Sequence, residues 1–533
     1  MLGPWSDRLR RRISHRTAIA LVITMSVLVG ATSYAFVGYL HPSAAGPSAC
    51  RRQPLSGTSV LSGSPAELAA EVASSLLGCA SSVVVANDSP ASVAAAMPLA
   101  ERAHAPLLLS SPLSATATSI ISYRGGLPAQ DRAQSASSAS TLAALREISD
   151  LHPRYVLAVG LKTSELSAEI PGARVTSDPA GLAGMSQPKP LSHVVVLVSK
   201  DDSAVAMAAT ATAEAAGATV VAMPGYDPRG DSAAITTIAR AKPREVLAVG
   251  GGFGPASRLV SRLAVVRTGV QLPGGGQLIV PMHRLVALYG HPGVPSLGAL
   301  GEQGISAGVA RIKKLAASYQ ALTTSPVVPA FEIITSLATS APGPAGDYSY
   351  ETPVASLLPW VRAATAAGMY VILDLQPGRD SFLAQAKLYQ PLLELPNVGL
   401  ALDPEWALKS NQIPMQQIGN VSITDVNSVV SWLGQLTAEY RLPQKLLVLH
   451  EFKSGEISDL QGLDTHNDDL AIVMDMDGQG SPATKQQTWN FITHTTPAGV
   501  PFGWKNFFVK DSPMLNPAQT MAHTPQPVMI SYE

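Results

Sequence analysis

The sequence predicts an α/β protein that consists of an N-terminal transmembrane helix, two repeated parallel α/β units and a C-terminal (β/α)8 barrel. Three observations support this prediction: an uncharged apolar run follows a basic N-terminus, a short segment recurs 90 residues later, and eight apolar runs alternate with helical segments in the second half. Short β-branched runs between turn residues are typical of parallel strands when helices separate them. The expected parts are 1–45 for the basic segment and membrane helix, 46–65 for a linker, 66–183 and 184–275 for the α/β units, and 282–533 for the barrel.

The composition limits the classes of function. The chain has 533 residues, of which 46% are hydrophobic and 14% charged, and its formal net charge is −1. This balance excludes charge-driven disorder and argues against a dedicated nucleic-acid-binding protein. Residues 1–284 carry 24 basic and 17 acidic side chains, whereas residues 285–533 carry 13 and 21. The acidic second half favours a site built from carboxylates.

The N-terminus has the pattern of an export or anchor segment. Five arginines precede the uncharged run 18–40, whose 23 residues would span about 34 Å as a helix and cross a membrane. The basic residues place the N-terminus in the cytoplasm and the rest of the chain outside. We therefore expect a single-pass membrane protein, with a cleaved signal near Ser43-Ala44-Ala45 as the alternative. A buried helix of a soluble protein is a further alternative.

The two cysteines, Cys50 and Cys79, both follow the apolar run. An extracytoplasmic compartment permits a disulfide between them. Two independent thiols are equally compatible with the sequence.

An internal repeat organises the first half. The segment Pro153-Arg154-Tyr155-Val156-Leu157-Ala158-Val159-Gly160 recurs from Pro243 to Gly250 with seven of eight residues identical. A Val-Val-Val run precedes each copy, at 83–85 and at 194–196. Each copy is expected to form alternating strands and helices of one small parallel sheet.

These residues resemble the cell-wall-binding repeat 2 family over residues of about 55–270. The resemblance rests on Val83-Val84-Val85-Ala86-Asn87-Asp88, the helix Ser92 to Ala100, the strand Ala105 to Ser110, and Val156 to Gly160. It implies a bacterial surface protein that attaches to cell-wall polysaccharide or an anionic wall polymer. The family's helix opens with Asp where Ser92 stands, and the family assembles three units where two occur here.

Eight apolar strands are expected in the second half, in the number and spacing of a (β/α)8 barrel. An open doubly wound sheet is the alternative. The expected strands are Arg284–Tyr289, Val328–Ile334, Tyr370–Leu375, Val398–Leu402, Leu446–His450, Ala471–Met476, Phe502–Phe508 and Val528–Tyr532.

Polar side chains gather where these strands end, which is the working face of such a barrel. Since Asp and Glu are depleted in strands, their placement at five strand ends suggests a shared pocket. The candidate catalytic residues are Asp403, Glu405, Glu332, Glu451 and Asp475. The candidate substrate-binding residues are His291, Asp374, Trp406, His450, Asp477, Trp504 and Tyr532.

Asp403 and Glu405 form the sharpest pair. Residues i and i+2 of a strand face the same side, about 6.6 Å apart, and paired carboxyl groups can act as acid and base on a glycosidic bond. Trp406 beside them offers a flat face for a sugar ring. The alternative is that Asp403 caps a turn with Pro404 and that Glu405 is solvated. Asp475 and Asp477 share the spacing, although Gly478 makes a turn equally plausible there.

The second half also resembles barrel glycoside hydrolases at a few positions. Asp403-x-Glu405 is similar to the end of the acidic motif of family 18 chitinase-like enzymes and family 25 lysozymes. Ala401 stands where family 18 has another Asp, and Trp504-Lys505-Asn506 stands where a two-glutamate hydrolase has a Glu. The resemblance implies hydrolysis or recognition of a polysaccharide without a cofactor. No metal site is predicted, since no ligand pair has a known metal-site spacing.

The sequence therefore predicts a membrane-anchored envelope protein that binds a wall polymer and carries a glycoside-hydrolase-like barrel. The first alternative is a noncatalytic scaffold with a degenerate barrel. The second is a periplasmic-type receptor with a small-molecule cleft between the two α/β units.

Overall fold

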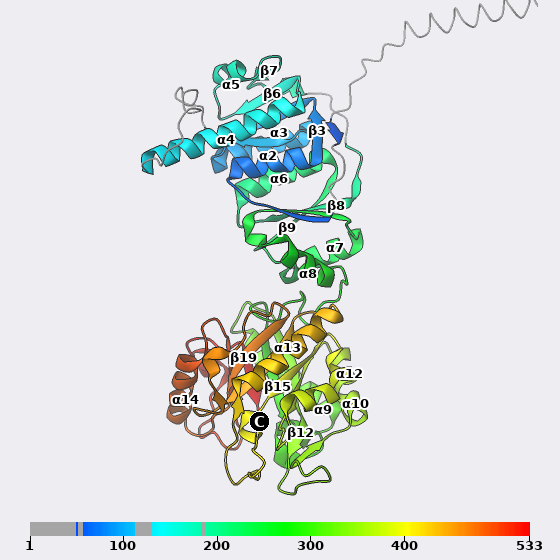
Figure 1. Ribbon diagram of the computed structural model, residues 1–533, viewed down its shortest axis with the longest axis vertical. Helices are drawn as coiled ribbons and strands as arrows, with labels where there is room; N and C mark the ends of the chain where they lie inside the picture. The colour runs from blue at the N-terminus through cyan, green and yellow to red at the C-terminus, as the bar shows by residue number, and fades with distance from the viewer. Residues whose placement is uncertain (1–48, 52–56, 112–128, 183–187) are drawn as a thin grey trace, which may run out of the picture. The chain divides into compact units, whose positions relative to one another are not determined.

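The computed structural model in Figure 1 describes residues 49–51, 57–111, 129–182 and 188–533. The predicted membrane segment 18–40 lies outside these residues. Within the described ranges, no helix combines the length and the apolar character needed to cross a membrane. The chain forms two compact units, the first built mainly from Pro65–Pro190 and the second from Leu191–Thr210 and Ala218–Glu533 with the short segment Pro54–Ser64.

The first unit is a four-stranded parallel sheet covered by helices (Figure 1). Its core strand is apolar on both faces, since Val83, Val84 and Val85 are all fully buried. The strands, in the order in which they pair, are β5 (Leu107–Ser110), β4 (Ser82–Asn87), β6 (Tyr155–Val159) and β7 (Arg174–Thr176). The helices are α2 (Pro65–Leu76), α3 (Pro90–Ala103), α4 (Ala129–Leu151) and α5 (Thr163–Glu169).

Two short strands that are distant in the sequence pair at the start of this unit. Strands β1 (Ala49–Arg51) and β3 (Leu77–Ala80) pair antiparallel, with Cys50 opposite Cys79. Cys79 is disulfide-bonded, so the structure has the disulfide that the sequence left open. The bond links the residues just outside the apolar run to the first α/β unit.

The second unit begins with a sheet of the same strand order, but its fourth strand comes from upstream. The order is β9 (Ala218–Met223), β8 (Leu191–Ser199), β10 (Glu245–Val249) and β2 (Gly57–Leu61), all parallel. The predicted linker 46–65 is therefore wrong at 57–61. Its Ser/Gly/Pro content suggested a flexible segment, yet Val60 packs against the apolar core of this sheet and five residues suffice for one ladder. Helices α6 (Ser203–Ala216), α7 (Ser232–Ala241) and α8 (Ala256–Val266) complete this part.

Residues from 284 onward form a closed barrel of eight parallel strands, as the sequence predicted. Strand β11 pairs with both β12 and β21, which closes the sheet and excludes the open doubly wound alternative. The barrel strands are β11 (Arg284–Gly290), β12 (Val327–Ala338), β14 (Tyr370–Leu375), β15 (Val398–Leu402), β17 (Lys445–Glu451), β19 (Leu470–Met476), β20 (Phe502–Asn506) and β21 (Met529–Tyr532).

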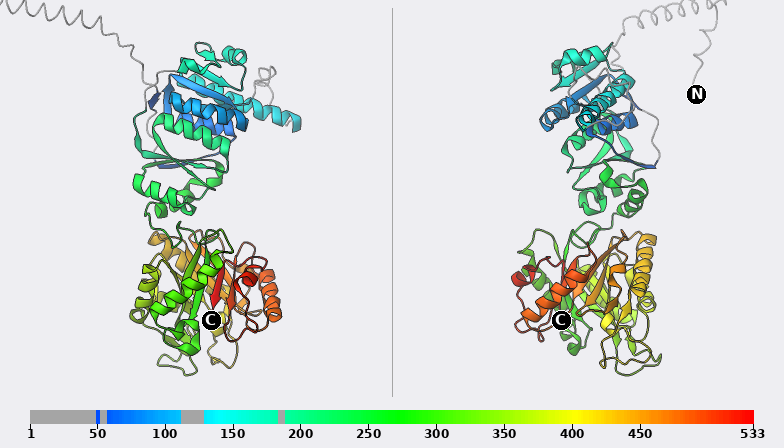
Figure 2. Two further views of the ribbon diagram at one scale, coloured as in Figure 1. Left: turned by 180° about the vertical axis from the view of Figure 1, so that it is seen from behind. Right: turned by 60° about the vertical axis from the view of Figure 1, so that its left-hand side comes forward.

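Helices surround the barrel on the outside, as the views from behind and from the side show (Figure 2). They are α9 (Ile305–Gln320), α10 (Val354–Ala366), α11 (Phe382–Leu388), α12 (Gln390–Leu393), α13 (Ile423–Glu439), α14 (Pro482–Thr495) and α15 (Pro517–Met521). Outside the barrel ladder, β13 (Ser349–Glu351) adds antiparallel to β12, and β16 (Val421–Ser422) pairs with β18 (Ile457–Ser458).

The interior of the barrel changes from apolar to charged along its axis. The apolar part includes Ala287, Ala330, Ile372, Ala401 and Val448, all fully buried. Because inward-facing side chains recur every second residue of a strand, the next inward positions are polar. These positions are Tyr289, Glu332, Asp374, Asp403 and His450, with Asp475 following Val473 on β19.

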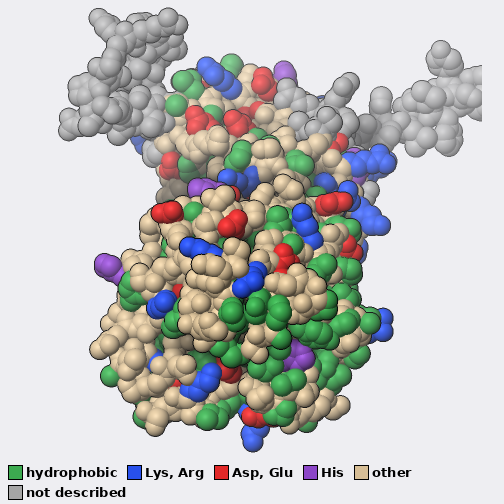
Figure 3. Space-filling model, turned by 60° about the horizontal axis from the view of Figure 1, so that its bottom comes forward, with side chains coloured by type: hydrophobic (Ala, Val, Ile, Leu, Met, Phe, Trp, Pro, Cys, Tyr) green, Lys and Arg blue, Asp and Glu red, His purple; other side chains and the backbone are tan. Residues whose placement is uncertain are grey.

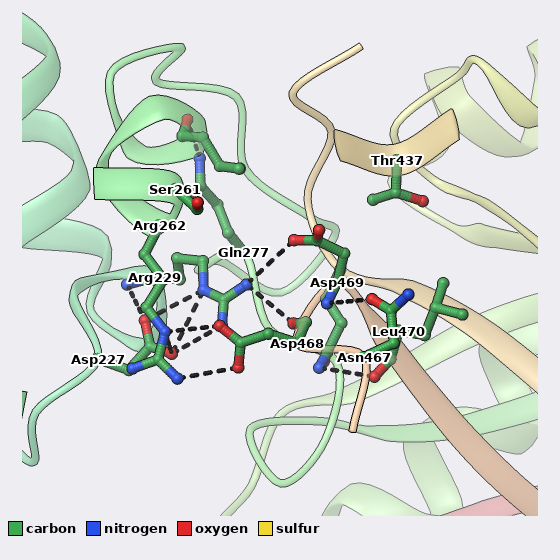
Figure 4. Close-up of polar contacts among 12 residues, drawn as sticks. Asp227, Arg229, Ser261, Arg262, Gln277, Thr437, Asn467, Asp468, Asp469 and Leu470 are labelled. Atoms are coloured by element: carbon green, nitrogen blue, oxygen red, sulfur yellow. Dashed lines mark hydrogen bonds and ion pairs between the residues drawn. The ribbon is translucent and has the colours of Figure 1, made fainter. Parts of the chain in front are cut away.

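The buried Arg229 connects the loop before barrel strand β19 to the four-stranded α/β part of the second unit (Figure 4). The Arg229 side chain is 2% exposed and lies 2.9 Å from carboxylate oxygens of both Asp227 and Asp468. Asp469 lies 3.6 Å from the same guanidinium. Arg262 donates to both carboxylate oxygens of Asp468, at 2.7 and 2.9 Å. The pKa of Asp468 is lowered, because these arginines outweigh the effect of its partial burial.

We predict that Asp468→Asn lowers the free energy of unfolding by about 1–2 kcal/mol, because it leaves the buried Arg229 with fewer compensating charges. Asp464→Asn, an exposed change in the same loop, is the control and should stay within about 0.5 kcal/mol. Chemical denaturation measures both. The lowered pKa means that the Asp468 contribution is present above the ordinary carboxyl pKa and lost as the pH falls below it. A difference between the wild type and the variant that grows towards acid pH would contradict this assignment.

Candidate active site

A cavity of about 450 Å³ opens at the carboxyl end of the barrel strands. Four carboxyl groups line it, and aromatic and lysine side chains alternate with them. The lining includes Tyr289, Gln376, Asp403, Glu405, Trp406, Phe452, Asp477, Lys505, Phe507, Lys510 and Glu533. Figure 3 turns the bottom of the molecule forward, and there acidic side chains are scattered among hydrophobic and other side chains.

His450 lies at the centre of the charged layer below this cavity. Its Nε2 is 3.1 Å from Glu332 and 3.8 Å from Asp374, and its Nδ1 is 3.3 Å from Asp475 and 3.5 Å from Asp477. Burial alone would lower the pKa of His450, but its interactions with Asp475 and Glu332 raise it well above the ordinary value. The ring is therefore an imidazolium, held by carboxylates of three other strands or strand ends.

Lys505 supplies the second buried cation. Its Nζ lies 3.1 Å from Asp477 and 3.1 Å from Glu533, and it sits 3.5 Å from the centroid of the Tyr289 ring. Burial favours the neutral amine, but the charges of Asp477 and Glu533 raise the pKa of Lys505 well above its ordinary value. Lys510 completes the group with a 3.0 Å contact to Glu533. Lys505 is thus an ammonium ion and no nucleophile.

Asp403 and Glu405 both line the cavity, although not as alternate residues of a strand, because β15 ends at Leu402 and Pro404–Trp406 form a 3-10 helix. Asp403 is only 3% exposed, and it does not cap the following turn with its side chain. Neither carboxyl group makes a hydrogen bond or an ion pair within the described part of the chain. Burial raises the pKa of Glu405 to about 7, with the charge of Asp477 adding to the effect. Burial and then the charge of Glu405 raise the pKa of Asp403 well above its ordinary value.

Three other predicted residues belong to the layer beneath the cavity. Glu332, Asp374 and Asp475 are fully buried, and none of them lines the cavity. Asp374 accepts a 2.9 Å hydrogen bond from the Tyr289 hydroxyl, and burial raises its pKa to about 7. The catalytic roles predicted for Glu332 and Asp475 do not fit this position, because both contact His450, which does not line the cavity either. Trp406 and Asp477 line the cavity directly.

Four predicted residues lie away from this cavity. Glu451 follows the inward-facing His450 and is therefore on the outward face of β17, where burial raises its pKa to about 7. His291 lines a separate cavity of about 600 Å³ and lies 3.1 Å from the Thr352 hydroxyl. Trp504 is fully buried against His523, with ring centroids 3.9 Å apart. Tyr532 is buried with its hydroxyl 2.5 Å from that of Tyr319. The alternation of side chains along a strand explains why Glu451, Trp504 and Tyr532 lie away from the cavity, since the inward-facing positions beside them are 450, 505 and 533.

Four residues that line the cavity were not among the predicted site residues: Tyr289, Lys505, Lys510 and Glu533. A lysine in the interior of a predicted strand was the available signal for Lys505, because a charged strand residue needs partners. Glu533 and Lys510 become relevant only once β20 and β21 pair. None of the described residues forms a group of three or more side chains suited to a metal ion.

Comparisons with known proteins add little to this site. No protein-family model matches the chain, and no curated protein matches it significantly. Among solved structures, the chain is similar to Cwp6 from Clostridium difficile, with a TM-score of 0.26 and 13% identity over 52% of this chain and 63% of that one. The chain therefore spans less than two thirds of that structure, and the likeness assigns neither a family nor a function.

We predict that His450→Gln lowers the free energy of unfolding by about 3–5 kcal/mol, because Glu332, Asp374 and Asp475 then lose the buried cation that contacts them. The pKa of His450 is raised, so its contribution is complete below about pH 6.5 and is lost as the pH rises through the raised pKa. Unfolding curves at pH 6 and at higher pH should show this decrease. The control His466→Gln changes a ring that is 94% exposed. Equal effects of the two substitutions would argue against the imidazolium.

Proposed function

We propose that the barrel is a glycoside-hydrolase-like domain that binds and cleaves a polysaccharide. The observation that carries this proposal is the pair Asp403 and Glu405, which line the cavity without any hydrogen-bond or ion-pair partner in the described part of the chain. Buried carboxyl groups normally have partners. The missing partner is therefore assigned to a ligand rich in hydroxyl groups.

The aromatic lining supports a sugar ligand. Trp406, Phe452, Phe507 and Tyr289 all reach the cavity. Flat apolar faces next to hydrogen-bonding groups suit a pyranose ring, which has C–H bonds on its faces and hydroxyl groups around its edge. The cavity volume of about 450 Å³ also lies in the usual range for small-ligand sites.

The electrostatics support an acid and a base of opposite protonation. Glu405, with its pKa raised to about 7, is assigned as the general acid that protonates the leaving oxygen. Asp477 is assigned as the carboxylate that activates water or attacks the sugar. Burial raises the pKa of Asp477, and the Lys505 ammonium 3.1 Å away opposes that shift in favour of the ionised form. The negative charge of Asp477 in turn helps to keep Glu405 protonated, which is how paired carboxyl groups divide these roles.

The location of the protein is part of the proposal. The basic N-terminus and the apolar run 18–40 support a single membrane anchor, with secretion to the wall if the segment is cleaved. The two α/β sheets share one strand order, in keeping with the expected wall-binding repeats. We propose that they hold the barrel near cell-wall polysaccharide or an anionic wall polymer.

We predict that Glu405→Gln and Asp403→Asn each reduce the release of reducing ends from purified wall glycans by at least about 100-fold. The assay uses the full chain, and Glu439→Gln, an exposed change on α13, serves as the control. Both variants keep the size of the side chain. Glu405→Gln removes the proton of the assigned general acid, and Asp403→Asn removes the unpartnered carboxyl group beside it that is assigned to ligand binding. Glycan binding without release by the wild type would instead support the noncatalytic scaffold.

We further predict that the rate on wall glycans falls as the pH rises through about 7. Glu405 acts in its protonated form, and burial places its pKa at about 7. Initial rates between pH 5 and 9, at glycan concentrations well below saturation, report the pKa of the ligand-free protein and measure this decrease. A rate that stays constant across pH 7 would remove Glu405 from the role of general acid.

A further inference from the structure

The cavity and the charged layer beneath it, together called the mouth of the barrel, contain more acidic than basic side chains. The acidic residues number seven: Glu332, Asp374, Asp403, Glu405, Asp475, Asp477 and Glu533. Against them the described contacts place three basic residues, His450, Lys505 and Lys510. Seven against three leaves four more acidic than basic side chains, and burial raises the pKa values of Asp374, Asp403, Glu405 and Asp477. A ligand that brings positive charge would lower these pKa values and so stabilise the carboxylate forms.

The three cations are spread unevenly. His450 contacts carboxylates of the lower layer and Asp477. Lys505 is shared between Asp477 and Glu533, and Lys510 contacts Glu533. Asp403 and Glu405 form no ion pair among the described residues. The charge of His450, and for Glu405 also that of Lys505, only opposes the rise in their pKa values that burial causes.

Asp403 gives a second indication, independent of the number of acidic groups, that the cavity binds a ligand. Its side chain lines the cavity although the residue is only 3% exposed. It makes no hydrogen bond and no ion pair within the described chain, and it does not cap the turn that it begins. Burial favours the protonated form of Asp403 in the empty cavity, and a charged donor beside it favours the carboxylate instead. The charge-assisted hydrogen bond that then forms is stronger than a neutral one.

We propose that the cavity takes an amino sugar with a free amino group, whose ammonium is seated on Asp403. The substrate class is then a polysaccharide that contains non-acetylated amino sugars. An ammonium offers three donors and one positive charge, whereas an N-acetyl group offers one neutral N–H. This inference rests on the proposed glycan-binding function and names its substrate class, with Asp403 as the specificity-determining residue.

The same contacts disfavour an anionic sugar in the barrel. An anionic substituent would need Lys505 or Lys510, and both ammonium groups are already paired with Asp477 or Glu533. An anion would therefore have to displace a carboxylate within a cavity that is acidic overall. Binding of an anionic wall polymer is better assigned to the α/β units than to the barrel.

The test compares two ligand series of equal length with the full chain at pH 6. Isothermal titration measures the affinity for glucosamine oligosaccharides and for their fully N-acetylated counterparts. The expected result is at least about tenfold tighter binding of the amino series. Equal affinities, or tighter binding of the acetylated series, would overturn the inference. This comparison requires only the wild type, so a variant that folds poorly cannot obscure it.

The role of Asp403 is tested in the same titration. Asp403→Asn keeps the shape of the side chain and should bring the affinity ratio of the two series close to one, while Glu439→Gln should leave it unchanged. An unchanged ratio in Asp403→Asn would overturn the assignment of the ammonium seat. Reducing-end release is measured on both series in parallel. Cleavage of the acetylated series without an amino preference refutes only the substrate class, whereas an amino preference without any cleavage refutes only the hydrolase.

Discussion

The charged layer inside the barrel depends on two buried cations. His450 and Lys505 lie among carboxylates that would otherwise repel one another in a water-poor interior. Replacing such a layer by apolar side chains is often neutral or stabilising for a fold, so stability alone does not account for it. The arrangement instead keeps several acids at fixed positions below a cavity, at a cost for folding, and the proposed acid–base chemistry would use these positions.

Closure of the sheet makes this arrangement possible. The acids come from strands separated by up to about two hundred residues, and only the pairing of β11 with both β12 and β21 brings them around one axis. Parallel strands present their carboxyl ends on the same side, so each strand adds one inward side chain to the layer. The cavity then lies above the layer. In the cavity, Asp477 forms an ion pair with Lys505, whereas Glu405 forms none among the described residues.

The sequence predicted the strands well and the direction of side chains less well. All eight barrel strands were expected, because β-branched runs bounded by turn residues are a strong local signal. Glu451, Trp504 and Tyr532 were misplaced because attention to strand ends ignored the period of two that points them away from the axis. Strand β2 could not be predicted, since its five residues gain stability only from β10, almost two hundred residues later. The ion pairs of Lys505 likewise depend on contacts between strands that no local pattern reveals.

The uneven sharing of cations connects fold, chemistry and specificity. Asp477 and Glu533 both contact Lys505. The pKa of Glu533 is lowered by its lysine partners, whereas burial still raises the pKa of Asp477 against the opposing charge of Lys505. Asp403 and Glu405 form no ion pair among the described residues, and burial favours their protonated forms. A cavity organised in this way holds a proton donor and a carboxylate at the same pH. Its acidic excess also means that a cationic ligand relieves repulsion on binding, whereas a neutral ligand leaves it in place.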